Sequence, residues 1–96
     1  MDNTYIVRRR FEFAGRVQGV GFRWRTKIAA EELDLTGWVK NEWDGSVIME
    51  VQGPPEKIEK LITTLQNARY IKIRDIRMRE LPVDPKEKQF RVGSSY

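Results

Sequence analysis

The fold of this chain is indicated first by two adjacent stretches, Ile6-Val-Arg-Arg-Arg-Phe-Glu-Phe-Ala14 and Gly15-Arg-Val-Gln-Gly-Val-Gly-Phe-Arg23. The first stretch alternates apolar and charged side chains, which predicts a half-buried strand with one solvated face. The apolar side carries Val7, Phe11 and Phe13, and the charged side carries Arg8, Arg10 and Glu12. From Phe22 to about Leu33, small and apolar residues recur at helical spacing. The glycine stretch therefore joins a strand to a helix.

Two more strands and a second helix follow at short intervals. Leu35–Lys40 predicts a strand, and the turn signal Asp44-Gly45 joins it to a returning strand, Val47–Val51. Gly53-Pro54-Pro55 ends that strand and opens the second helix. Its apolar residues are spaced i, i+3, i+4 and i+7: Ile58, Leu61, Ile62 and Leu65.

The C-terminal part predicts one long strand and one short one. Ile71–Met78 alternates, but the alternation slips at Asp75, which indicates a β-bulge. Pro82–Lys88 is a loop, and Phe90–Val92 is a short last strand.

This order of elements, βαββαβ with a fifth edge strand, is typical of the α+β class. It predicts a ferredoxin-like sandwich, in which two helices cover one face of an antiparallel sheet of four to five strands. We expect residues 1–96 to form a single domain of this kind. In this fold the first and second strands run parallel, so both end at one edge of the sheet. The glycine loop and Asn41, which follow these two strands, should therefore meet.

The composition narrows the chemistry. There are 18 Lys and Arg against 14 Asp and Glu, and the net charge of +4 suits an anionic ligand. The chain has no cysteine and no histidine, so it lacks a thiolate nucleophile, the usual general base and the commonest metal ligand. No apolar run approaches membrane-spanning length, and the charged start does not resemble a signal peptide. We expect a cytoplasmic monomer that binds no membrane and needs neither metal nor cofactor.

The glycine stretch has the features of a phosphate-binding loop. Glycines let the backbone approach a ligand, and consecutive N–H groups then point at one anion. We expect these groups to be those of Gln18, Gly19, Val20, Gly21 and Phe22. Arg23 adds a planar guanidinium that matches two phosphate oxygens, at the positive end of a helix dipole. An ordinary connecting loop with a solvated Arg23 is the alternative that this segment alone leaves open.

Two well-known phosphate loops fit the segment less well. A P-loop needs Lys followed by Ser or Thr after its last glycine, where this chain has Phe22 and Arg23. The dinucleotide-binding fingerprint needs a third glycine, where this chain has Trp24.

Asn41 suggests what happens to a phosphoryl group in this loop. Its amide can accept from and donate to a water molecule, and it does not repel phosphate as a carboxylate would. Without histidine, the best leaving group is one that needs no proton, such as a carboxylate with a pKa near ~4. Hydrolysis of a carboxyl–phosphate anhydride therefore fits better than ester hydrolysis. Taken alone, however, Asn41 is better explained as a hairpin residue.

On these residues the chain resembles the acylphosphatase family. The resemblance covers nearly the whole chain and rests on Gly15–Arg23, Gly37-Trp-Val-Lys-Asn41, Asp44-Gly45-Ser46-Val47, Gly53 and the final Phe90-Arg-Val pattern. It implies a metal-independent enzyme that hydrolyses acyl phosphates to a carboxylate and inorganic phosphate. It also implies that Arg23 binds the phosphate and that Asn41 orients the water. The chain departs from the family at Asp34, where members often have glycine; a positive φ there would cost local stability.

Two other functions remain open at this point, an RNA-binding module of similar architecture and a catalytically silent structural domain. An RNA recognition motif needs aromatic side chains on the open face of its sheet, where this chain is expected to carry solvated charges, so we expect no nucleic-acid partner. A silent domain needs neither Arg23 nor Asn41. Trp24 and Trp38 are predicted to pack in the core or against the helices, and Trp43 to be exposed in the hairpin. Thr26 is expected to support the loop and Arg23 or to fill a packing gap.

Overall fold

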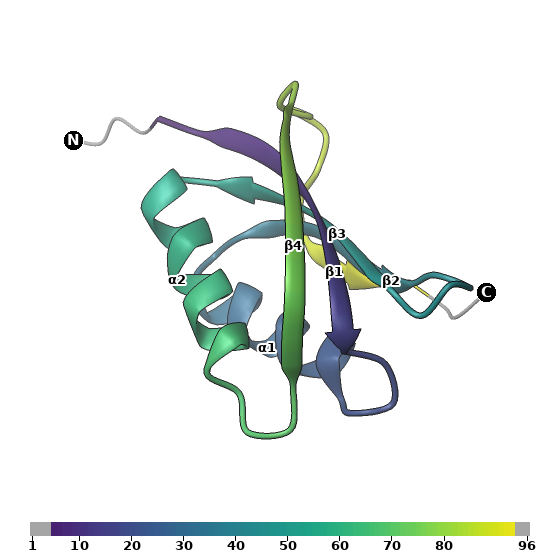
Figure 1. Cartoon of the computed structure of the whole chain (residues 1–96). Coiled ribbons are helices and arrows are strands. Elements are labelled where there is room, and N and C mark those ends of the chain that lie inside the picture. Colours follow the sequence, from purple (N-terminus) through teal and green to yellow (C-terminus); the bar gives the residue numbers. More distant parts are fainter. Residues whose placement is uncertain (1–4, 94–96) are drawn as a thin grey trace.

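The computed structural model describes residues 5–93, which contain two helices and five strands (Figure 1). In chain order they are β1 (Val7–Arg16), α1 (Phe22–Glu32), β2 (Thr36–Asn41), β3 (Val47–Gly53), α2 (Pro55–Gln66), β4 (Lys72–Leu81) and β5 (Phe90–Val92). The predicted order of elements is confirmed, including the short fifth strand. β1 continues past its predicted end at Ala14, so the glycine stretch begins inside the strand.

The five strands form one sheet in the order β4-β1-β3-β2-β5. β1 is antiparallel to β3 and β4, and β2 is antiparallel to β3. The order of elements predicts a wholly antiparallel sheet, but β5 pairs with β2 in parallel, so the sheet is mixed. Because β1 and β2 flank β3 on opposite sides, they run in the same direction and end at the same edge of the sheet.

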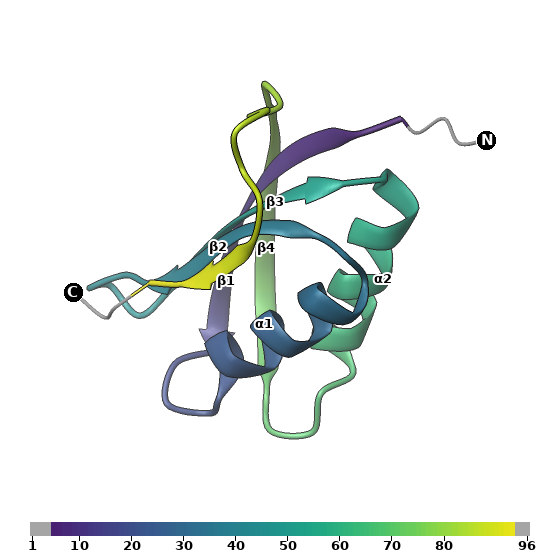
Figure 2. The same cartoon turned by 180° about the vertical axis from the view of Figure 1, so that it is seen from behind.

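Both helices cover the same face of the sheet, which Figure 2 shows from the helix side. The core lies between these two layers, and its fully buried members include Phe13, Val17, Val39, Val51, Leu61 and Leu65. The rings of Phe13 and Phe22 lie 5.1 Å apart between centroids. This contact fastens the first residue of α1 to β1, which holds the two ends of the connecting loop in place.

A β-bulge lies just before that loop. Ala14 pairs with Asp75 and Gly15 pairs with Ile73, so Arg74 has no opposite residue on β1. The bulge that the sequence predicts at Asp75 is therefore confirmed, one residue away. A Cβ atom on Gly15 would come within 2.2 Å of the Lys72 carbonyl oxygen. Gly15 thus permits the close approach of β1 and β4.

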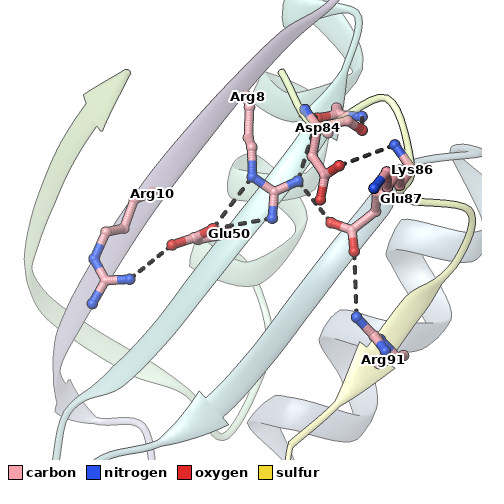
Figure 3. A network of polar contacts seen from close by, with 8 residues as sticks. Arg8, Arg10, Glu50, Asp84, Lys86, Glu87 and Arg91 are labelled. Atoms are coloured by element: carbon pink, nitrogen blue, oxygen red, sulfur yellow. Dashed lines mark hydrogen bonds and ion pairs between the residues drawn. The ribbon is translucent and has the colours of Figure 1, made fainter. Parts of the chain in front are cut away.

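The prediction that the charged face of β1 is solvated is wrong for Arg8, which is only 6% exposed. Its guanidinium donates to Glu87 Oε1 at 2.7 Å and to Glu50 Oε1 at 3.0 Å, and Glu50 also accepts from Arg10 at 2.9 Å (Figure 3). Burial lowers the pKa of Arg8, but the hydrogen bonds and charges of Glu87 and Glu50 outweigh it, so the pKa is raised.

The same network fastens the loop between β4 and β5 to the open face of the sheet. The Gln52 side chain accepts from the Asp84 N–H at 2.8 Å and donates to the Asp84 carbonyl oxygen at 3.0 Å. Glu87 also forms an ion pair with Arg91 on β5 at 3.5 Å (Figure 3). The segment that leads into β5 is therefore attached to the sheet at Asp84, before Glu87, and at Arg91, after it.

Replacing Glu87 with glutamine should lower the free energy of unfolding by about 1.5–3 kcal/mol, because it weakens a charged hydrogen bond at a side chain that is 5% exposed. The matched control is Glu80→Gln. Glu80 pairs with Arg9 at 2.9 Å but is 57% exposed, and surface pairs contribute about 1 kcal/mol or less. Urea unfolding of the two variants measures the difference. Equal losses would show that burial adds nothing to the Arg8–Glu87 pair.

Asp34 adopts the strained backbone that its departure from the family pattern suggests. Among residues 5–93 it is the one non-glycine residue with a positive φ, 58°, directly after the end of α1. Asp34→Gly should stabilise the fold by about 0.5–1 kcal/mol, since glycine adopts this conformation without a Cβ clash. Thermal unfolding should show a midpoint about 2–8 °C higher. Glu32→Gly, at the last residue of the helix, is the control and should lower the midpoint.

Candidate active site

The candidate site lies at the sheet edge where β1 and β2 end. A cavity of about 300 Å³ opens there, between the loop that follows β1 and the end of β2. Gly19 and Gly21 line it from the loop, Arg23 from the first turn of α1, and Asn41 from the end of β2. The parallel course of β1 and β2 therefore brings Arg23 and Asn41 to one place, as the order of elements predicts.

The loop backbone is open toward solvent at its two central glycines. Gly19 and Gly21 have φ values of 74° and 79°, in the left-handed region that favours glycine. A Cβ atom added to either would meet no heavy atom within 4 Å. Gly21 is the N-cap of α1 and offers no capping side chain, so the first N–H groups of the helix are suited to an anion. Of the other predicted phosphate-binding residues, Phe22 lines the cavity, whereas Gln18 and Val20 do not.

The Gln18 side chain has a contact that the sequence did not reveal. Its Nε2 donates to the carbonyl oxygens of Glu42 at 2.7 Å and Ser46 at 2.9 Å. These two residues flank the hairpin turn that follows Asn41. Gln18 therefore fastens the glycine loop to the hairpin that follows Asn41.

A short hydrogen-bond network stabilises that hairpin. Asp44 Oδ1 accepts from the Ser46 hydroxyl at 2.7 Å and from the Ser46 N–H at 3.0 Å. Both bonds lower the pKa of the Asp44 carboxyl, and the bond from the Ser46 hydroxyl has the larger effect. The turn that Asp44-Gly45 predicts is thus stabilised by its own side chains. It lies next to Asn41, which is 9% exposed.

The Arg23 guanidinium is held from the other side by the end of β5. Its Nη1 donates to the Gly93 carbonyl oxygen at 2.7 Å, and the Gly93 N–H donates to the Val39 carbonyl oxygen at 2.7 Å. A guanidinium carries five N–H donors, so this contact leaves donors for a ligand. No sequence pattern indicates this partner, because the acceptor is a backbone carbonyl oxygen.

The three tryptophans differ from one another in burial. The prediction that Trp24 packs in the core is wrong: it is 65% exposed and lines the cavity beside Arg23. Trp38 is half-buried on the open face of the sheet, opposite Glu50, so it does not pack against the helices either. Trp43 is 77% exposed in the hairpin, as predicted.

Thr26 is buried and donates to the Phe22 carbonyl oxygen at 2.7 Å, which supports the first turn of α1.

The charge around the cavity suits a phosphate. Arg23 is the one charged side chain among the described residues that line it. A larger hollow of about 470 Å³ lies between the two helices, but its charged lining is three carboxylates, Glu32, Glu56 and Glu59, against the single cation Lys60, which disfavours an anion. Within residues 5–93 no group of three or more Asp and Glu is arranged to hold a metal ion. Neither described helix is long and apolar enough to cross a membrane.

Gly21→Ala should weaken the binding of inorganic phosphate about tenfold or more, because a methyl group would enter the cavity and shift the loop backbone. The matched control is Gly45→Ala in the hairpin turn, where φ is 94° and an added Cβ also meets nothing within 4 Å. Both variants should lose about 1 kcal/mol of stability from the left-handed backbone. Calorimetric titration with phosphate distinguishes the two variants by their phosphate affinity. Equal phosphate affinity in both would show that the Gly21 backbone does not face the ligand.

The comparisons with known proteins agree with one another. The sequence model of the family described as Acylphosphatase matches residues 9–92. An acylphosphatase of Clostridium perfringens is 42% identical over 86 residues, which span 88% of this chain and 97% of that protein. The structure of the Bacillus subtilis acylphosphatase has a TM-score of 0.84 at 32% identity, over 91% of this chain and 98% of that one.

A similar unit also occurs within a larger protein. Full-length HypF, solved in a phosphate- and nucleotide-bound form, matches 98% of this chain with 13% of its own length, at a TM-score of 0.87 and 31% identity. None of these similarities favours an RNA-binding module or a catalytically silent domain.

Proposed function

The chain belongs to the acylphosphatase family, and we propose that its glycine loop, Arg23 and Asn41 carry out the hydrolysis of acyl phosphates. The products are a carboxylate and inorganic phosphate. The observation that most supports these residue roles is that Arg23, Asn41, Gly19 and Gly21 line one cavity, although they come from a loop, a helix and the end of a strand.

Binding of the phosphoryl group is the first task. The N–H groups of Gly19, Gly21 and Phe22, whose residues line the cavity, hold its oxygens. The neighbouring N–H groups of Gln18 and Val20 are assigned to the same task from the sequence alone. Arg23 contributes a two-pronged contact to two of these oxygens, with its orientation fixed by the Gly93 carbonyl. Preorganised donors of this kind stabilise charge without rearranging during the reaction.

Attack by water is the second task. Asn41 orients a water molecule toward phosphorus on the side opposite the acyl oxygen. A bond forms between the water oxygen and phosphorus while the bond from phosphorus to the acyl oxygen breaks, and its electron pair stays on the carboxylate. The water proton passes to a phosphate oxygen. A carboxylate needs no proton to leave, because its pKa is near ~4, and no covalent intermediate with the protein forms.

Hydrolysis of benzoyl phosphate tests the proposal, followed by ultraviolet absorbance with and without a chelator. We expect rapid hydrolysis in both conditions. A well-folded protein with no activity would overturn the assigned function, and activity lost with the chelator would show that a metal takes part.

Location and assembly complete the proposal. We infer that the enzyme acts in the cytoplasm as a monomer without a cofactor, on small acyl phosphates. Light scattering should then give a mass near 11.4 kDa, and twice that mass would contradict the monomer.

A further inference from the structure

Trp24 is the least expected residue of the cavity that holds Arg23 and Asn41. It is 65% exposed, although its indole is large and apolar. It lines the cavity from the first turn of α1, and Val92, which is 37% exposed, lines it from β5. The cavity therefore has a polar side, formed by the loop, Arg23 and Asn41, and an apolar side.

The cavity has room for more than a phosphoryl group. Its volume of about 300 Å³ lies at the lower end of the range for small-molecule pockets. Beyond the phosphate, a ligand would meet an indole and a valine. No charged side chain other than Arg23 is among the described residues that line the cavity. A charged acyl group would thus lose hydration without gaining a counter-charge, whereas an apolar one would bury surface.

We propose that Trp24, together with Val92, forms the acyl-binding wall of the site and makes the enzyme selective for acyl phosphates with aromatic acyl groups. This inference rests on the proposed function, since it takes the phosphoryl group to lie against the loop and Arg23. An aromatic acyl group can pack against the indole in an offset or edge-on arrangement, which adds to the gain from burial. The contact is present in both the bound substrate and the transition state, so it acts on KM rather than on kcat.

The experiment compares benzoyl phosphate with acetyl phosphate, which share the reacting group and differ in the acyl part. In Trp24→Ala we expect the KM for benzoyl phosphate to rise about tenfold and that for acetyl phosphate to change less than about twofold, with kcat retained. Trp24→Phe should restore most of the lost affinity. Trp43→Ala is the matched control, because Trp43 is also exposed, at 77% against 65% for Trp24, but lies outside the cavity lining; neither KM should change.

A binding measurement supplies a second readout. Calorimetric titration with phenacylphosphonate, a stable analogue of benzoyl phosphate, should give about tenfold weaker binding in Trp24→Ala than in the parent and in Trp43→Ala. Inorganic phosphate should inhibit all of these proteins equally.

The two proposals fail in different ways. If the parent hydrolyses both substrates and Trp24→Ala leaves the ratio of the two KM values unchanged, the acyl-binding role is overturned while the proposed function stands. An equal rise of both KM values would also overturn it, since Trp24 would then support the phosphate loop. If the parent hydrolyses neither substrate, the proposed function fails and this inference falls with it.

Discussion

Replacing Arg23 with lysine should lower kcat/KM for acyl phosphates by about a thousandfold or more, even though the positive charge remains. The guanidinium is planar and held at Nη1 by the Gly93 carbonyl oxygen at 2.7 Å, so its remaining donors have a fixed direction. An ammonium offers a single point of contact and a flexible stem. Its three donors share one nitrogen, so they cannot reproduce the planar fork that holds two phosphate oxygens while Gly93 is also bound, and the two-pronged contact would be lost.

Steady-state kinetics with inorganic phosphate as a competitive inhibitor measure this effect. Arg23→Ala should lose both turnover and inhibition by phosphate. Arg25→Lys is the matched control, since Arg25 is exposed on the same helix and does not line the cavity; it should behave as the parent does. A fully active Arg23→Lys enzyme would contradict a bidentate contact between Arg23 and the phosphate.

The sequence predicted the elements of this fold because its patterns are local. Alternation in β1, helical spacing in α2 and the Asp44-Gly45 turn each depend on residues a few positions apart, and each is found as predicted. The meeting of Arg23 and Asn41 at one edge needed one further step, the parallel course of the first two strands. That step follows from the order of elements alone.

The contacts that tune the site could not be predicted in the same way. Arg8 alternates as a solvated residue should, but it is buried by Glu87, which approaches from the far end of the chain. Gly93 holds Arg23 through a carbonyl oxygen, which every residue possesses. The size and apolar character of Trp24 suggest the core, but it lies two positions after the buried Phe22, away from the buried face of α1, and lines the cavity beside Arg23. Such features arise from tertiary contacts rather than from residue type.

Replacing Asn41 with alanine should lower kcat by about a hundredfold to a thousandfold, the range seen when one oriented donor is removed from an active site. The affinity for inorganic phosphate should stay within about twofold of the parent, because the loop and Arg23 remain. Asn41 stands at the end of β2, paired with Val47, and alanine keeps that backbone pairing. The effect should therefore fall on turnover and not on the fold, which circular dichroism can check.

The matched control is Asn67→Ala, since Asn67 is an exposed cap at the end of α2 and is not among the residues that line the cavity. Its kinetics should match those of the parent. Asn41→Asp adds a further distinction: it keeps the shape of the side chain but introduces a negative charge, so it should weaken phosphate inhibition as well as turnover. If Asn41→Ala instead lost phosphate affinity in step with kcat, Asn41 would be a phosphate ligand, and the attacking water would have to be oriented by another group at this edge of the sheet.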